Sequence, residues 1–242
     1  LILQMLLWSD QRITLEACND AVVVQPDKRP GFSSGDRFFD PQDIVNICSG
    51  LVITVWSNTG YIDFQYLQLA HASVREYLSS HELISSFQLQ LKEDHARTCL
   101  LRLCHTYLCC IDWNTIGNDP VELEQTFPLA DWAASTWPEH ARFLEADALA
   151  SILAFLHQDR VLSENFFRYS IGPLYWSDRT QCYPLYFAAL MGLRLSCMQL
   201  MQSDSADTLK ESVQNHLQPT QSDRGPTTQM RLDASLFAAS TR

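Results

Sequence analysis

The chain has 242 residues, 46% of them hydrophobic, and its 17 lysines and arginines against 28 aspartates and glutamates give a net charge of −11. A chain of this length and apolar content buries a sizeable core in one or two domains, which excludes a disordered tail. A negative surface repels a phosphate backbone, and eight cysteines are too few for a disulfide scaffold, so nucleic acid is disfavoured as a ligand and a cytoplasmic location is expected.

The first 36 residues predict two helices and a loop. Leu1 to Trp8 is apolar, but it lacks the basic start and cleavage site of a signal peptide and is too short to span a membrane. We therefore expect a core helix that is apolar on several faces and leaves an exposed patch for a protein neighbour or a second copy. Thr14 is a suitable N-cap for a second helix, from Leu15 to about Val23. The prolines and glycines of segment 25–36 predict an exposed loop.

A third helix and a β-hairpin are predicted next. Asp40 can cap the helix and Pro41 suits its first turn, while the residues expected on its buried side are Ile44, Ile47, Cys48 and Leu51. Segments 51–56 and 61–69 predict strands joined by a turn at 57–60. Three helices and a two-stranded wing predict a winged-helix domain over residues 1–90.

The segment 67–78, LQLAHASVREYL, marks the point where the second strand runs into another helix. Ser73 is expected to be the N-cap, with Glu76 three residues later completing a capping box. His71 then lies just outside the N-terminus of this helix. Arg75 and Glu76 are expected to be a solvated pair and a cap.

Helical periodicity continues beyond the winged helix. Segment 92–110 predicts a long amphipathic helix whose buried face is formed by Ala96, Leu100, Leu103, Cys104 and Tyr107. Pro128 can open another helix, which Pro138 is expected to stop or restart, and a further helix is predicted over 145–158. Residues 91–175 therefore predict a helical linker domain.

The C-terminal segment 182–242 predicts a helix pair followed by a loose polar insertion over 208–230. The small residues Ala188 and Ala189 allow two helices to pack closely, and Gly192 can end the first helix. Segment 234–240 is a possible start of a second helix pair of the same kind.

Four stretches together carry a family resemblance. The LAHASVREYL motif resembles one that closes the winged helix of fungal NACHT-type STAND NTPases, NLR-like signalling proteins with C-terminal ankyrin repeats. Segments 39–55, 128–143 and 182–193 (FDPQDIVNICSGLVITV, PLADWAASTWPEHARF and CYPLYFAALMGL) are similar to the same family in the same order. The resemblance implies a mainly α fold: a winged helix with a small β-hairpin wing, a helical domain and a degenerate ankyrin-like helix pair. It also implies that the NTPase core of the family precedes this region and is missing here.

The resemblance implies particular roles for three residues. In the family, a winged-helix histidine contacts the phosphates of ADP, so His71 would sense a nucleotide only together with the missing NTPase core. Tyr186 and Leu193 would bind a protein partner through the ankyrin-like end. The family further implies a cytoplasmic location.

Enzymatic chemistry is not indicated by the residues themselves. There is no P-loop motif, and neither Asp112 nor Asp131 has a partner at a catalytic spacing, so we expect no catalytic residue and no cofactor. Asp131 and His140 are interpreted as structural hydrogen-bonding groups. The group formed by Cys99, Cys104, Cys109, Cys110 and His105 does not share one helix face, so buried thiols are favoured over a metal site.

The preferred hypothesis is therefore a non-catalytic regulatory and protein-interaction fragment of a NACHT–ankyrin signalling ATPase. Its partners would be proteins: the missing NACHT core, a second copy or an ankyrin ligand, with no nucleic acid and no membrane. The alternatives are a winged-helix nucleic-acid-binding protein, which the acidic charge disfavours, and a stand-alone ankyrin-type scaffold.

Overall fold

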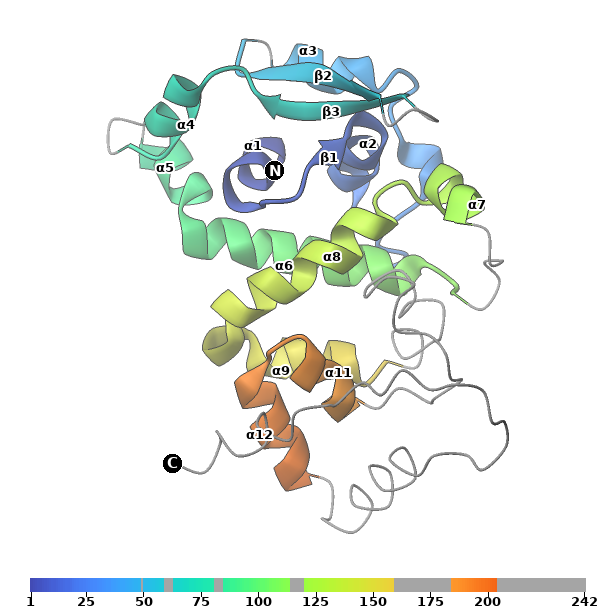
Figure 1. Cartoon of the computed structure of the whole chain (residues 1–242), viewed down its shortest axis with the longest axis vertical. Helices are drawn as coiled ribbons and strands as arrows, with labels where there is room; N and C mark the ends of the chain where they lie inside the picture. Colours follow the sequence, from blue (N-terminus) through green and yellow to red (C-terminus); the bar gives the residue numbers. More distant parts are fainter. Residues whose placement is uncertain (49, 59–62, 81–84, 114–119, 159–183, 204–242) are drawn as a thin grey trace, which may run out of the picture. The chain divides into compact units, whose positions relative to one another are not determined.

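The computed structural model describes residues 1–48, 50–58, 63–80, 85–113, 120–158 and 184–203. This part is mainly helical with one small antiparallel sheet, as the sequence predicted (Figure 1). The strands are β1 (Ile13–Thr14), β2 (Val52–Asn58) and β3 (Asp63–Leu69). The helices are α1 (Ile2–Trp8), α2 (Leu15–Val23), the 3₁₀ turn η1 (Ser34–Asp36), α3 (Gln42–Ile47), α4 (Ala72–Leu78), α5 (Ser85–Leu91), α6 (Glu93–Cys110), α7 (Pro120–Thr126), α8 (Ala130–Phe143), α9 (Glu145–Leu156), α11 (Pro184–Leu190) and α12 (Arg194–Ser203).

The sheet has the strand order β1–β3–β2, with both pairs antiparallel. Ile13 pairs with Leu67 and Val52 pairs with Leu69, so these side chains share the face that is buried against the helices. β2 and β3 confirm the predicted hairpin. The two-residue strand β1 was not predicted because so short a segment has no measurable alternation, and the predicted turn at 57–60 lies partly outside the described residues.

Helix α1 is enclosed, which contradicts the exposed patch expected for it. Its Met5 and Leu7 are buried, and it contacts α6 and β3. Its polar side chains bind α5, since Gln4 donates to the Gln90 carbonyl at 2.7 Å and the Trp8 indole donates to the Leu91 carbonyl at 2.9 Å. The sequence suggested an uncovered helix because the residues of β3, α5 and α6 that cover it lie more than 50 positions later in the chain.

The loop after α2 is only partly exposed, so the prediction for segment 25–36 was wrong at its centre. Gly31 and Phe32 are buried there, and the Phe32 ring meets the edge of Tyr107 at 4.7 Å. A Cβ on Gly31 would clash with the Thr106 Cγ2. Glycine at this position therefore lets the loop backbone press directly on α6.

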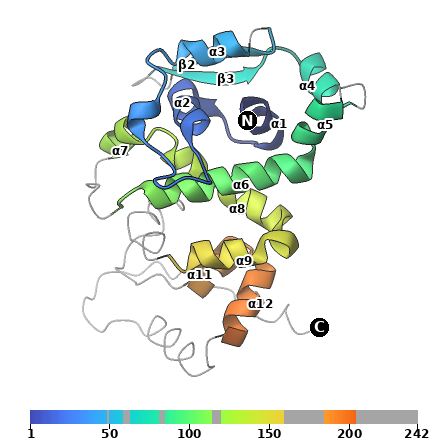
Figure 2. The ribbon, with the colours of Figure 1, turned by 180° about the vertical axis from the view of Figure 1, so that it is seen from behind.

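Helix α6 confirms the predicted long amphipathic helix, and all five of its predicted core residues are buried. It packs on α8, which begins at Ala130 and runs past Pro138 instead of ending there. Pro138 is itself buried, next to the fully buried Trp137, so tertiary packing outweighs the cost of the missing backbone hydrogen bond. In the view from behind, α1 and α2 lie above α6, and α8 crosses α6 before it leads to α9 (Figure 2).

Helices α11 and α12 form a hairpin that contacts α9. Gly192 has a φ of +71° and ends α11, where the Leu193 amide donates to the Ala188 carbonyl at 2.8 Å, a Schellman arrangement. The hairpin and the role of Gly192 are thus confirmed. One buried cluster runs from Ile2 in α1 to Leu200 in α12, so the predicted segments 1–90, 91–175 and 182–242 share a core as far as they are described. Their boundaries stay predictions, and the features expected at 208–230 and 234–240 lie outside the described residues.

Candidate functional site

His71 lies on the surface as the N-cap of α4. Its Nδ1 accepts a hydrogen bond from the Ser73 amide at 3.1 Å and lies 2.9 Å from the Ser73 hydroxyl. The predicted cap at Ser73 with Glu76 is therefore wrong, because α4 begins two residues earlier than the capping-box pattern implied. One ring nitrogen of this exposed residue is therefore used to cap the helix.

Arg75 binds backbone instead of forming the expected solvated pair with Glu76. Its guanidinium donates to the carbonyls of Leu6 and Leu7, at 2.7 and 2.9 Å, at the C-terminal end of α1. A cation at this end satisfies carbonyls that have no partner within the helix and complements its dipole. His71 and Arg75 thus both act as helix caps.

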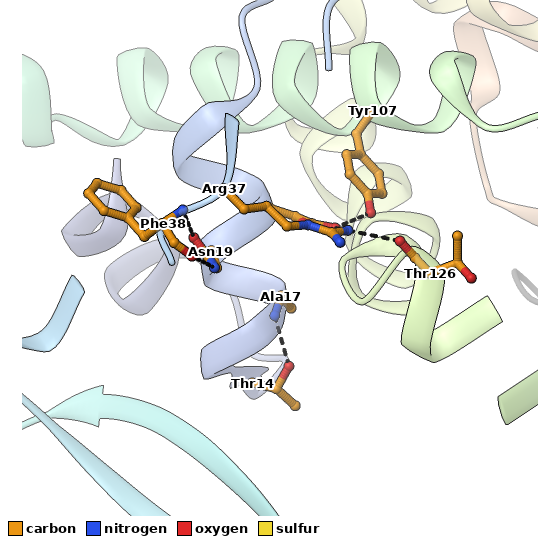
Figure 3. A network of polar contacts seen from close by, with 8 residues as sticks. Thr14, Ala17, Asn19, Arg37, Phe38, Tyr107 and Thr126 are labelled. Carbon is orange, nitrogen blue, oxygen red and sulfur yellow. Dashed lines mark hydrogen bonds and ion pairs between the residues drawn. The ribbon is translucent and has the colours of Figure 1, made fainter. Parts of the chain in front are cut away.

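A buried carboxylate, Asp20, is the centre of a polar network. Figure 3 labels three other members of it, Arg37, Tyr107 and Thr126. Arg37 binds both of its oxygens, and the Tyr107 hydroxyl donates to one of them. Arg37 also donates to the Thr126 carbonyl at 2.8 Å. The network therefore connects four parts of the chain: helix α2, the loop that precedes α3, helix α6 and helix α7. Desolvation, together with the Asp20 charge, raises the pKa of the Tyr107 hydroxyl well above its ordinary range.

Sequence reasoning missed this network, although a signal was present. Asp20 follows Ala17 by three residues and precedes Ala21 by one, so it lies on the side of α2 that the two alanines bury. A charge in such a position indicates a buried partner. Both oxygens of Asp20 accept from donors of the fold, and the side chain is fully buried, so the network is structural and a substrate does not reach it.

A second buried group consists of three ring nitrogens, His105 Nε2, Trp137 Nε1 and His140 Nε2, which have no hydrogen-bond partner among the described residues. The His105 ring stacks on Phe155 at 3.8 Å, and its centroid is 5.3 Å from that of Trp137. Burial lowers the pKa of His105 to about 3. Burial, with the nearby Arg97 charge second, lowers the pKa of His140 to about 4.

The geometry fixes the tautomer of His140. Arg97 can only donate, so His140 Nδ1, 3.2 Å from Arg97 Nη1, accepts and the proton lies on Nε2. The expected structural role of His140 is consistent with this bond. Because these rings are packed among aromatic side chains, they form part of the core.

No arrangement of residues for metal binding or metal-assisted catalysis is found in the described ranges. They contain no group of three histidine, cysteine or acidic side chains that could hold a metal ion. They also contain no helix that is long and apolar enough to cross a membrane. Helix α3, the recognition helix of the nucleic-acid alternative, has one acidic residue, Asp43, and no Lys or Arg.

Two side chains near the α8–α9 turn form hydrogen bonds with the turn that connects α11 to α12. Arg142 donates to the Met191 carbonyl at 2.9 Å, where α11 ends. The buried Glu145 accepts from the Ser196 amide at 2.8 Å and from the Ser196 hydroxyl at 3.0 Å, in the first turn of α12. A cation therefore meets the end of one helix and an anion meets the start of the next, as the helix dipoles favour.

The opposite side of the α11–α12 hairpin is exposed and apolar. We name this surface the hairpin face; it is formed by Tyr186, Leu190, Leu195, Met198 and Met201, between 36% and 59% exposed. From Pro184 to Ser203 the chain has no acidic residue, and Arg194 is its one charged residue. So little charge is unusual for an exposed surface.

The two residues expected to bind a partner fall in different places. Tyr186 is 59% exposed and belongs to the hairpin face, whereas Leu193 is fully buried. The prediction for Leu193 is therefore wrong: it follows Gly192 in the Schellman turn, which directs it into the core.

A second exposed apolar surface lies on α3 and β2. It includes Ile47, which is 68% exposed and was predicted to be buried, and Trp56, which is 66% exposed. Ile44 alone takes the fully buried position on α3, because this helix is only six residues long. Ile53 and Val55 are also partly exposed, but they lie on the opposite face of β2 from Trp56, because side chains alternate along a strand.

Comparison with known proteins gives one partial similarity. No protein-family model matches the chain, and no solved structure matches it. The chain is 26% identical over 141 residues to "Azaphilone pigments biosynthesis cluster protein L" of Monascus ruber. The aligned part is 57% of this chain and 30% of the fungal protein, so the chain spans less than a third of that relative.

These comparisons contradict the resemblance to NACHT-type NTPases with ankyrin repeats. No model of any such family matches, and the relative has a different description. The motif around His71 is short, and local structure accounts for it: His71 caps α4, Arg75 caps α1 and Leu78 is buried. The nucleotide-sensing role of His71 depended on that family and is not carried further.

Proposed function

We propose that this chain is a non-catalytic protein-interaction module, and that the hairpin face is its binding surface. The observation that carries the proposal is the combination of exposed apolar side chains and missing acidic residues on α11 and α12. In a chain with a net charge of −11, a protein partner meets neither strongly hydrated carboxylates nor repulsion there.

The residues that could carry chemistry support a binding role. Asp20 and Glu145 are buried and occupied by donors of the fold, and His105 and His140 are packed in the core. These four side chains are buried, so they are assigned to the packing of the fold and not to a reaction.

The proposal also covers the fold of the N-terminal part, its partners and its location. We describe α2, α3 and the β2–β3 hairpin as a winged-helix-like unit, in which the acidic α3 disfavours a nucleic-acid partner. A cytoplasmic location fits free thiols such as the buried Cys18 and Cys104. The name of the fungal relative adds a setting, an azaphilone pigment biosynthesis cluster, in which to look for partner proteins.

The test compares the unfolding free energy and the dye binding of the double variant Leu190→Glu/Met198→Glu with those of the wild type, both at a protein concentration low enough that the chains are monomeric. Both side chains are more than 40% exposed, so a binding surface predicts an unfolding free energy within about 0.5 kcal/mol of the wild type. Fluorescence of a dye that binds apolar surfaces should fall at the same time.

The matched control is Ile47→Glu/Trp56→Glu, which removes the apolar side chains of the α3–β2 surface. This control should remove the dye signal from the α3–β2 surface and leave the dye signal from the hairpin face unchanged. Strong destabilisation by the hairpin variant, with no loss of dye signal, would mean that the hairpin face is packed inside the protein, and the proposal would fail.

A further inference from the structure

We propose that the hairpin face binds a second copy of the same chain, with the two α12 helices packed antiparallel about a two-fold axis at Met198. This inference rests on the proposed function, because it assigns an occupant to the same surface. Two α11–α12 hairpins that meet in this way form a four-helix bundle.

The first reason is the order of the exposed residues along α12. Leu195 and Met201 lie three residues before and after Met198, on the same side of the helix. A stripe with this symmetry matches an antiparallel copy of itself, since Leu195 of each chain then meets Met201 of the other. A two-fold contact requires such self-complementarity.

The second reason is charge. Arg194 is four residues before Met198, and Gln202, which is also exposed, is four residues after it. Antiparallel packing places each Arg194, about 6 Å along the helix from the axis, level with Gln202 in the last turn of the other α12. That turn carries partial negative charge and has no basic residue of its own.

The charge of the whole chain also favours this surface for a second copy. Two chains that each carry −11 repel one another wherever their acidic side chains approach. The segment from Pro184 to Ser203 has no acidic residue, so a like-charged copy can reach the hairpin face without that repulsion.

The α11 helix contributes the sides of the contact. Tyr186 and Leu190 are four residues apart and share one face of α11. Because α11 packs against α12 in the hairpin, a second copy on the α12 stripe would also approach these exposed α11 side chains.

The test is sedimentation velocity of the full chain from low to high micromolar concentration. The wild type should have the mass of two chains. Met198→Glu places two carboxylates together at the axis and should give one chain, whereas the control Ile47→Glu, on the α3–β2 surface, should remain dimeric. Arg194→Gln should weaken dimerisation about 3- to 30-fold, because it removes two symmetric contacts with a helix end.

A cysteine at the axis gives an independent readout. Met198→Cys should form a disulfide between two copies of position 198, identified by mass spectrometry, because residues at the axis approach within disulfide distance. Ile47→Cys is the matched control and should not form one.

The outcomes separate the two proposals. A wild type that is monomeric, but whose dye binding is lost in the hairpin double variant, overturns the second copy and leaves another protein as the occupant. A dimer that Met198→Glu does not dissociate also overturns it. A monomer whose dye binding is unaffected by the hairpin variant would remove both the dimer and the proposed function.

Discussion

Acid should destabilise the fold through the buried histidines His105 and His140. Their pKa values in the folded chain are about 3 and about 4, below the ordinary value of 6.5. The unfolded chain therefore binds these protons first as the pH falls. Stability is fully present above about pH 6.5 and is lost progressively below it, until the folded pKa values are reached.

The size of the effect follows from the same values. One pH unit within this window costs about 1.4 kcal/mol for each histidine, so at pH 5 the two together cost about 4 kcal/mol. Asp131 and Glu124 act in the opposite direction, because burial raises their pKa values and they bind protons more readily when folded. The loss from the two histidines alone is a large share of the roughly 5–15 kcal/mol that stabilises a typical domain.

The assay is urea unfolding at pH 7 and pH 5, followed by tryptophan fluorescence. His105→Phe keeps an aromatic ring against Phe155 and Trp137 and should remove about half of the pH dependence. His71→Ala, which removes a surface histidine, is the matched control. Equal unfolding midpoints at the two pH values, or an unchanged pH dependence in His105→Phe, would refute the reasoning.

Three further substitutions test the polar contacts by urea unfolding. Arg37→Met should cost about 2–4 kcal/mol, because it leaves the Asp20 charge buried without its cation, and Asp20→Asn in the same chain should recover part of that loss. Glu145→Ala should cost about 1.5–3 kcal/mol, because Ser196 loses a charged acceptor for two donors, and Glu145→Gln should cost less. His71→Ala should cost only about 0.5–1 kcal/mol, the usual value for an exposed N-cap.

For each of these three stability predictions, one outcome of the unfolding measurement would contradict it. Additive effects of Arg37→Met and Asp20→Asn would mean that the two side chains do not act as a pair. A Glu145→Gln variant as unstable as Glu145→Ala would show that the charge, and not the hydrogen bonds, holds α12. A loss of several kcal/mol in His71→Ala would give that residue a role in the core.

Local patterns predicted the elements that depend on neighbouring residues. Thr14 caps α2 by accepting from the Ala17 amide at 3.1 Å, as predicted. Asp40, the predicted cap of α3, accepts from the Gln42 amide at 2.9 Å, but α3 begins one residue later than predicted, with Pro41 as its N-cap. The buried face of α6 also follows directly from its periodicity. These features are determined within one or two turns of chain.

Contacts between distant segments could not be predicted in this way. Arg75 looked like a solvated residue because its acceptors, in α1, lie 68 and 69 positions earlier. Leu193 looked available for a partner because the sequence does not show which side of the Gly192 turn faces the core. The exposure of Met198 and Met201 could not be predicted from the sequence either. Ser196 and Leu200, on the same helix, are buried although one is polar and the other apolar, so residue type does not show which face of α12 is covered.

The contacts of Arg142 and Glu145 bear on how the protein opens locally. These two side chains, three residues apart, hold the last carbonyl of α11 and the first turn of α12. If either α11 or α12 separates from α9, a hydrogen bond to Arg142 or Glu145 is broken at the turn that connects the two helices. The hairpin should therefore detach as one cooperative unit while α6 and α8 remain folded, so that amide exchange in both of its helices reports a single opening event.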